Sequence, residues 1–182
     1  MKKTIALGAL CALLCSTAFA QNTVIVGGEL MYPNRDIVAN AVNSKDHTTL
    51  VAAVQAGGLV EVLQSEGPFT VFAPTNAAFA KLPEGTVATL LQPENKEALV
   101  GVLTYHVVPG KVDSKTLAKM IKDNGGSLEI TTVNGQKLTA MFNGPSNVVL
   151  KDTQGTVANI TTYDVMQSNG VIHVIDTVVL PQ

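Results

Sequence analysis

The apolar pattern changes from helical to strand-like near Gly125-Gly126, and this change limits the fold more than any other feature. Beyond it, two alternating runs flank Asn134-Gly135, a dipeptide favoured in the two-residue turn of a β-hairpin. Gln154-Gly155 and Asn169-Gly170 repeat the arrangement. The last run, 171–180, is apolar on both faces, so we expect a central strand there. Helices followed by antiparallel strands predict a single α+β domain and not a βαβ repeat.

The first half of the chain carries residues that start and stop helices. Asp36 is placed to cap one helix, and a second is expected to begin at Asp46 or Thr48 and to end at Gly57-Gly58. A buried strand is expected over 69–73, and a brief strand over 105–110 that Pro109-Gly110 closes. Further helical segments are predicted over 59–64, over 84–91, after Pro93, and over Lys115–Lys122 with Ser114 as its cap.

The N-terminus has the three parts of a signal peptide. Lys2 and Lys3 are positive, Ile5 to Cys15 is apolar, and Ala18-Phe19-Ala20 is a small-x-small cleavage site. The apolar stretch is too short for a transmembrane helix. We therefore predict a signal peptide over 1–20, a cut before Gln21, and a secreted or periplasmic protein with no membrane span.

Both cysteines of the chain, Cys11 and Cys15, lie in this predicted signal peptide. A lipid anchor requires a small residue before the modified cysteine, and Leu10 and Leu14 stand there instead. The mature chain is thus expected to be free of disulfides and held by its core alone. Residues 21–35 are expected to form an extended N-terminal arm, and 36–182 a single domain.

Charge and aromatic content exclude two classes of binding protein. Without Lys2 and Lys3, 10 of the 12 basic side chains remain against 14 acidic ones, a net charge of about −4. With no basic cluster, nucleic-acid binding is not expected. The chain has no Trp and only three Tyr, which argues against a platform that stacks on sugars.

The sequence contains none of the common catalytic motifs, such as Gly-x-Ser-x-Gly, His-Glu-x-x-His or a P-loop. It therefore predicts no enzyme, no cofactor and no metal site. His47 is expected at the surface or as a helix cap. His106 and His173 could form a metal or catalytic pair, but hydrogen-bonded core histidines are favoured because no carboxylate or Cys is spaced to join them. Asp152 and Asp176 are expected to be turn and sheet residues.

The stretch from Phe69 to Pro83, FTVFAPTNAAFAKLP, admits two interpretations. Pro74-Thr75-Asn76 could be a reactive loop at the end of a strand, or only the joint that caps the following helix. Thr75 is a poor nucleophile, and Pro74 removes a backbone N–H that an oxyanion hole would use. A cap needs only a side-chain oxygen from Thr75 or Asn76, so the cap is favoured.

This stretch resembles the first signature of the fasciclin domain family. LTYHVVPGKV (103–112) is similar to the family's Tyr-His segment, and SNGVIHVIDTVVLP (168–181) to its second signature. The order and spacing also fit, over about Asp36 to Pro181. The resemblance implies a wedge of two β-sheets with helices packed along one side. It also implies a secreted or surface-displayed protein that is not an enzyme.

The resemblance also suggests where a partner would bind. In animal matrix members, integrin binding has been linked to an Asp-Ile-Met segment and to the Tyr-His region. Asp164-Val165-Met166 and Tyr105-His106 stand at these places. The first segment is expected to be exposed before a polar turn. The alternative, that Val165 and Met166 pack under this turn, stays open.

Three functions are compatible with the sequence. The first is a secreted, non-enzymatic adhesion module that binds a protein or matrix partner. The second is a carrier of an apolar small molecule such as a carotenoid or lipid, since some algal fasciclin-like proteins hold carotenoids. The third, an uncharacterised enzyme, has no motif behind it.

Overall fold

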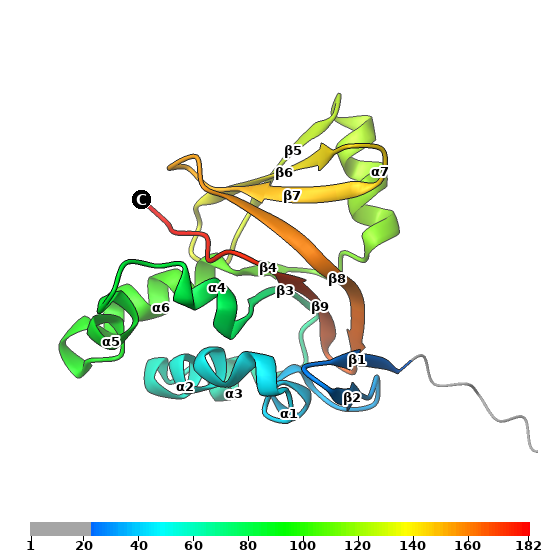
Figure 1. The fold of residues 1–182 in the computed structure, drawn as a ribbon. Coiled ribbons are helices and arrows are strands. Elements are labelled where there is room, and N and C mark those ends of the chain that lie inside the picture. The colour runs from blue at the N-terminus through cyan, green and yellow to red at the C-terminus, as the bar shows by residue number, and fades with distance from the viewer. Residues whose placement is uncertain (1–22) are drawn as a thin grey trace, which may run out of the picture.

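The computed structural model describes residues 23–182, in which a helical region precedes a large sheet (Figure 1). This arrangement confirms the predicted α+β class. The helical and 3-10 segments are α1 (Ile37–Ala41), η1 (Lys45–His47), α2 (Thr48–Gly57), α3 (Val60–Gln64), α4 (Asn76–Ala80), α5 (Thr86–Leu90), η2 (Pro93–Asn95), α6 (Lys96–Tyr105) and α7 (Ser114–Asp123). The strands are β1 (Val24–Val26), β2 (Glu29–Met31), β3 (Phe69–Pro74), β4 (Val107–Pro109), β5 (Ser127–Thr131), β6 (Lys137–Asn143), β7 (Asn147–Lys151), β8 (Val157–Gln167) and β9 (Gly170–Ile175).

The seven-stranded sheet has the order β4-β3-β9-β8-β7-β6-β5. Strand β9 lies between β3 and β8, and all six of its residues are buried. The strand predicted over 171–180 is therefore central, as expected, but it ends at Ile175. β9 runs parallel to β3, with Phe69 opposite Gly170 and Pro74 opposite Ile175, whereas the other neighbours are antiparallel. The hairpin pattern did not predict this parallel pair.

Strand β8 turns the sheet into a wedge. Its first residues pair with β7 and its later residues with β9, with register shifts between Ile160, Thr162 and Val165. Figure 1 shows β8 running from the β5–β7 layer down to β9. Such irregularities bend a strand and increase its twist. The wedge confirms the fold that the fasciclin resemblance implies.

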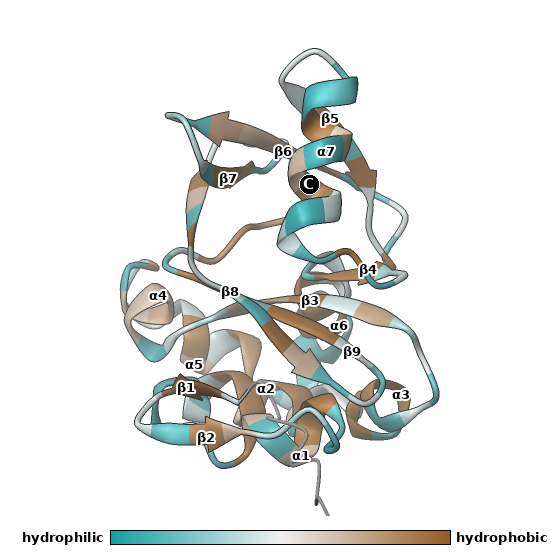
Figure 2. Cartoon of the chain, turned by 90° about the vertical axis from the view of Figure 1, so that its right-hand side faces the viewer, coloured by the Kyte–Doolittle hydropathy of each residue, from teal (hydrophilic) through white to brown (hydrophobic). Residues whose placement is uncertain are grey.

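Two apolar cores lie on opposite faces of β3 and β9. Val71, Ala73, Ile172 and Val174 belong to the core under α1, α2 and α6. Phe72 points the other way, into the core that α7 covers from the side of β5–β7. Figure 2 shows teal and brown segments alternating along α7, as expected for a helix with one side on a sheet. This two-sided burial explains why the central strands carry apolar residues on both faces.

The segment predicted as an extended arm, 21–35, differs from that expectation within the described residues. β1 and β2 form an antiparallel hairpin, and Val26 and Met31 are buried in the core. Gly27 and Gly28 adopt positive φ angles of 61° and 80° at the turn, as a two-residue hairpin turn requires. The alternation in Val-Ile-Val-Gly-Gly-Glu-Leu-Met is the signal for this hairpin.

Two predicted helix ends are confirmed. The Asp36 carboxylate accepts a hydrogen bond of 2.8 Å from the amide of Ala39 at the start of α1. Gly58 ends α2 in the left-handed conformation, with φ 73°.

Two other boundaries were wrong. Asp113, and not Ser114, caps α7, and its carboxylate accepts a hydrogen bond of 2.8 Å from the amide of Thr116. Tyr105 is the last residue of α6 and does not belong to the strand that follows.

The predicted signal peptide and the cut before Gln21 lie outside the described residues. Among the residues that are described, no helix has the length and apolar character needed to cross a membrane.

Candidate functional site

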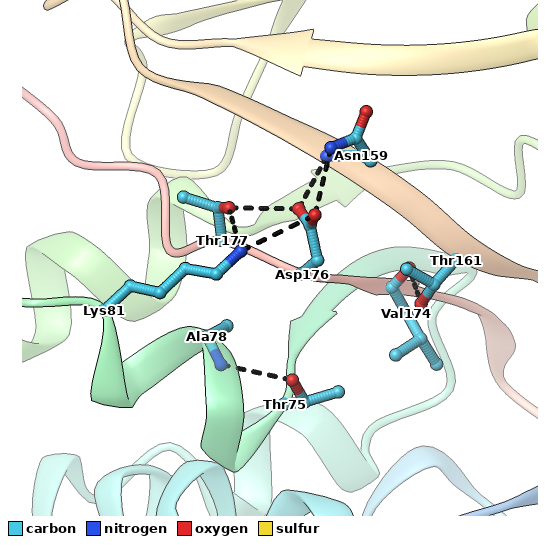
Figure 3. Close-up of polar contacts among 8 residues, drawn as sticks. All are labelled: Thr75, Ala78, Lys81, Asn159, Thr161, Val174, Asp176 and Thr177. Carbon is cyan, nitrogen blue, oxygen red and sulfur yellow. Dashed lines mark hydrogen bonds and ion pairs between the residues drawn. The ribbon is translucent and has the colours of Figure 1, made fainter.

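The Pro74-Thr75-Asn76 joint is a helix cap that also ties two elements together. Thr75 Oγ1 accepts a hydrogen bond of 3.2 Å from the amide of Ala78, which confirms the predicted cap (Figure 3). Asn76 reaches the start of α2, where its Oδ1 accepts from the amide of Thr49 at 3.0 Å and its Nδ2 donates to the carbonyl of Lys45 at 2.9 Å. The polar atoms of the joint therefore serve structure.

A polar cluster surrounds Asp176, just after β9 (Figure 3). Its carboxylate accepts hydrogen bonds from the amide and side chain of Asn159, at 2.8 and 2.9 Å, and from Thr177 Oγ1 at 3.0 Å. The Lys81 ammonium lies 3.6 Å away. Burial raises the pKa of Asp176, but the Asn159 and Thr177 hydrogen bonds and the Lys81 charge outweigh it, so the pKa lies below its usual value. Asp176 is the sheet residue that was predicted.

Asp152 is also the turn residue that was predicted. Its Oδ1 accepts hydrogen bonds from the amides of Gln154 and Thr156, at 3.0 and 2.8 Å. Its Oδ2 accepts from the amide of Leu180 at 3.0 Å. The carboxylate thus joins the turn between β7 and β8 to the segment after β9.

His106 and His173 are buried, hydrogen-bonded core residues, which confirms the favoured interpretation. His106 Nδ1 lies 2.8 Å from the Val102 carbonyl, and His173 Nε2 lies 2.9 Å from the Val112 carbonyl. Burial lowers the pKa of both rings, to about 4 for His106. Within residues 23–182, no three or more His, Cys, Asp or Glu residues are grouped to hold a metal ion.

The two segments proposed for partner binding are largely buried. Val165, Tyr105 and His106 are at most 3% exposed. The exposure expected for the first segment is therefore wrong for Val165. β8 continues to Gln167, which places Val165 in the core under α1 and α2. Tyr105 is covered on the other face, where its hydroxyl donates a hydrogen bond of 2.9 Å to the carbonyl of Lys137.

Asp164 and Met166 are partly exposed. Asp164 has a φ of 57°, in the left-handed region. Its carboxylate accepts hydrogen bonds from the amide of Ser114, at 2.7 Å, and from the Ser114 hydroxyl. The charge is therefore held against the start of α7, and its ability to bind a partner stays a prediction.

A cavity between the helices and the sheet is the feature that the sequence did not reveal. It has a volume of about 90 Å³ and lies under α1, α2 and α3, against β3 and β9. Its lining is mainly aliphatic and includes Val26, Met31, Ile37, Leu50, Leu63 and Val174.

His47 lines this cavity, and its predicted position at the surface or as a cap is wrong. The residue precedes α2, but its side chain makes no cap bond and is 3% exposed. Nδ1 lies 2.8 Å from Ser44 Oγ. Nε2 is the one buried side-chain nitrogen or oxygen in the described part of the chain that has no hydrogen-bond partner. The apolar residues that flank Ser44 and His47 at helical spacing were the available signal.

Comparison with known proteins identifies the family. The family model for the fasciclin domain matches residues 45–181. The chain is 50% identical to Protein sll1483 of Synechocystis over 145 residues, which cover 80% of this chain and 73% of that protein. It is 33% identical to immunogenic protein MPB70 of Mycobacterium bovis, over 80% of this chain and 68% of that one.

One animal relative and one solved structure are also similar to this chain. The chain is 36% identical to the transforming growth factor-beta-induced protein ig-h3 of Sus scrofa over 132 residues, which are 72% of this chain but only 17% of that protein. A structure of a FAS1 domain pair from the insect cell adhesion molecule fasciclin I superposes with a TM-score of 0.72 at 17% identity. This match covers 82% of this chain and 52% of that chain, and it shows a shared fold.

The three signature segments, the wedge-shaped sheet and the match over 45–181 lead to one conclusion. The chain belongs to the fasciclin domain family.

Proposed function

We propose that the mature chain is a non-enzymatic interaction module that binds a protein or matrix partner outside the cytoplasm. Membership of a family associated with adhesion proteins supports the proposal. The solved structure that shares the fold comes from a cell adhesion molecule, which supports it further. The signal peptide predicted over 1–20 favours export to the periplasm or the medium.

An exposed apolar pair on the β1–β2 hairpin is the observation that carries the proposal. Ile25 and Leu30 are directly opposite each other in the hairpin, with 66% and 44% of their surface exposed. Their neighbours Val26 and Met31 enter the core. The solvent side of such a hairpin normally carries polar residues, so two adjacent aliphatic side chains there favour a contact with another molecule.

The border of this pair is charged. Glu29, next to Leu30 in β2, forms an ion pair with Lys45, with 3.3 Å between the charged groups. An apolar centre beside a polar rim is the usual composition of a protein interface. We therefore favour a partner that offers an apolar patch.

Asp164 and Met166 remain a second proposed contact, because both are partly exposed. Val165, Tyr105 and His106 are buried, so they would support the surrounding structure and would not touch a partner.

The alternative, a carrier of a carotenoid or lipid, fits the geometry less well. The apolar cavity has a volume of about 90 Å³, whereas an engineered cavity that holds benzene measures about 150 Å³. A long polyene or acyl chain needs more room than this cavity offers, which favours the interaction module.

The test is a binding assay on the native cell surface and on extracellular matrix, with Ile25→Ser/Leu30→Ser as the variant. Val133→Ser/Val157→Ser is the matched control, because these two residues are also about half exposed but belong to other parts of the chain. We expect binding about tenfold weaker for the first variant and unchanged for the control, with equal melting temperatures. Equal binding by both variants would exclude the hairpin pair, and Asp164→Asn with Met166→Ala would then test the second contact.

A further inference from the structure

The helical layer encloses a cavity with one unsatisfied polar atom. The walls come from aliphatic side chains of α1, α2, α3, β3 and β9. Figure 1 shows these three helices together below the two strands. Val38, Val54 and Leu59 also line the cavity and are only partly buried, so it lies near the surface of the helical layer. A small molecule would therefore cross only a thin layer of side chains to enter.

His47 presents this polar atom. Because Nδ1 is turned to Ser44 Oγ at 2.8 Å, Nε2 is the ring nitrogen left for a ligand. Ser44 is itself held close to the β1–β2 turn, where a Cβ on Gly27 would lie 2.5 Å from Ser44 Oγ. Ser44 thus holds the ring at Nδ1 and leaves Nε2, on the other side of the ring, for a ligand.

The ring of His47 is neutral at pH 7. Burial lowers its pKa, and the nearby Ala73 carbonyl and Asp46 carboxylate, which raise the pKa, do not compensate. The Ala73 carbonyl lies near the ring but makes no hydrogen bond with Nε2. Depending on the tautomer, Nε2 is then a donor or an acceptor. A hydroxyl group can pair with either form, since it both donates and accepts.

A water molecule is a poor occupant of this site. Buried water usually makes about three hydrogen bonds, and the other polar side chains of the lining offer little. Ser44 is bonded to His47, both ring nitrogens of His106 are bonded to the backbone, and Gln55 is exposed on the outside. An organic hydroxyl needs only one partner here, while its carbon atoms contact the aliphatic walls.

We propose that this cavity binds a small aliphatic alcohol, whose hydroxyl group bonds to Nε2 of His47. The apolar walls select for the hydrocarbon part, and His47 selects for the hydroxyl and sets its orientation. This site is distinct from the Ile25–Leu30 pair, so it holds or fails independently of the proposed interaction surface.

Propan-2-ol and propane are suitable probes, because they share one carbon skeleton, differ by the hydroxyl group and are smaller than the benzene that a cavity of about 150 Å³ holds. Each is titrated into the purified protein with ¹⁵N-labelled histidine rings, and affinity is read from the ring signals and from the rise in melting temperature. We expect propan-2-ol to bind at least about tenfold more tightly than propane. The Nε2 signal of His47 should shift, whereas the signals of His106 and His173, whose ring nitrogens are already bonded, should not.

Two variants test Nε2 separately from Nδ1. His47→Asn keeps a polar atom near the Nδ1 position and removes the Nε2 position, so the variant should bind propan-2-ol and propane about equally. His47→Gln places a polar atom near Nε2 and should restore part of the preference. Equal binding of both probes to the unsubstituted protein, or binding of neither, would overturn the proposal without reference to any variant.

Discussion

The amide of Val179 donates a hydrogen bond of 3.3 Å to Nε2 of His106. Because an N–H group faces Nε2, the neutral ring carries its proton on Nδ1, which donates to the Val102 carbonyl at 2.8 Å. A second proton on Nε2 would meet the Val179 N–H and lose this bond. This arrangement agrees with the effect of burial, which lowers the pKa of His106 to about 4.

The first prediction is a loss of stability between pH 6.5 and 4. Below about pH 6.5 the unfolded chain binds a proton at His106, while the folded chain binds none until about pH 4. Stability therefore falls as the pH falls, by on the order of 3 kcal/mol from this group alone. Burial also lowers the pKa of His47 and His173, so these rings act in the same direction.

Urea unfolding at several pH values measures this loss. His106→Gln, which can still accept from Val179, should be less sensitive to pH over the same range. Identical pH profiles for the variant and the unsubstituted protein would contradict the assignment to His106.

The second prediction is that His106 and His173 hold opposite tautomers. The amide of Asp164 donates to Nδ1 of His173 at 3.3 Å, and Nε2 faces the Val112 carbonyl at 2.9 Å. His173 should thus carry its proton on Nε2, whereas His106 carries it on Nδ1. Nitrogen NMR at pH 7 distinguishes the two forms, and finding one tautomer in both rings would refute the prediction.

The third prediction concerns the joint after β3. Thr75→Ala removes the cap of α4 and should lower the free energy of unfolding by about 0.5–2 kcal/mol, whereas Thr75→Ser keeps the cap. Asn76→Ala removes the bonds to Thr49 and Lys45 and should cost about 1–3 kcal/mol. Denaturant unfolding provides the values. Equal losses for Thr75→Ala and Thr75→Ser would mean that the hydroxyl does not cap.

The fourth prediction is that Asp164 stabilises the fold through its backbone and its side chain together. Asp164→Ala places a residue with a Cβ and no polar group at φ 57° and removes the bonds to Ser114, at a cost of about 2–4 kcal/mol. Asp164→Gly removes the backbone strain but still loses the bonds to Ser114, and Asp164→Asn keeps one oxygen that can accept from Ser114. Unfolding measurements should place both between the parent and Asp164→Ala, and an unaffected Asp164→Ala variant would be evidence against this role.

Local patterns predicted much of the fold. The cap at Asp36, the cap at Thr75 and the hairpin around Asn134-Gly135 depend on residues a few positions apart, so the sequence displays them directly. The predicted two-residue turn of this hairpin was wrong, because the amide of Thr132 bonds to the carbonyl of Gln136 and leaves three residues between them. The parallel pairing of β3 with β9 was not predictable in this way. A buried strand is apolar on both faces whether its neighbour is parallel or antiparallel.

The candidate sites were harder to predict, because burial there depends on distant contacts. The bends in β8 interrupt the alternation before Val165 and hide that it faces the core. His47 stands where a polar residue commonly caps a helix, but its side chain makes no cap bond and lines the cavity instead.

The parallel pair also governs the order in which the chain can fold during synthesis. Partners such as Thr70 and Val171 are about a hundred residues apart, which a ribosome needs roughly 5–20 s to add. Until β9 emerges, the apolar strand β3 lacks its central neighbour and both cores stay open. Contacts this distant slow folding, and an unpaired apolar edge favours aggregation. The nascent protein therefore reaches its native state only after its final signature has been made.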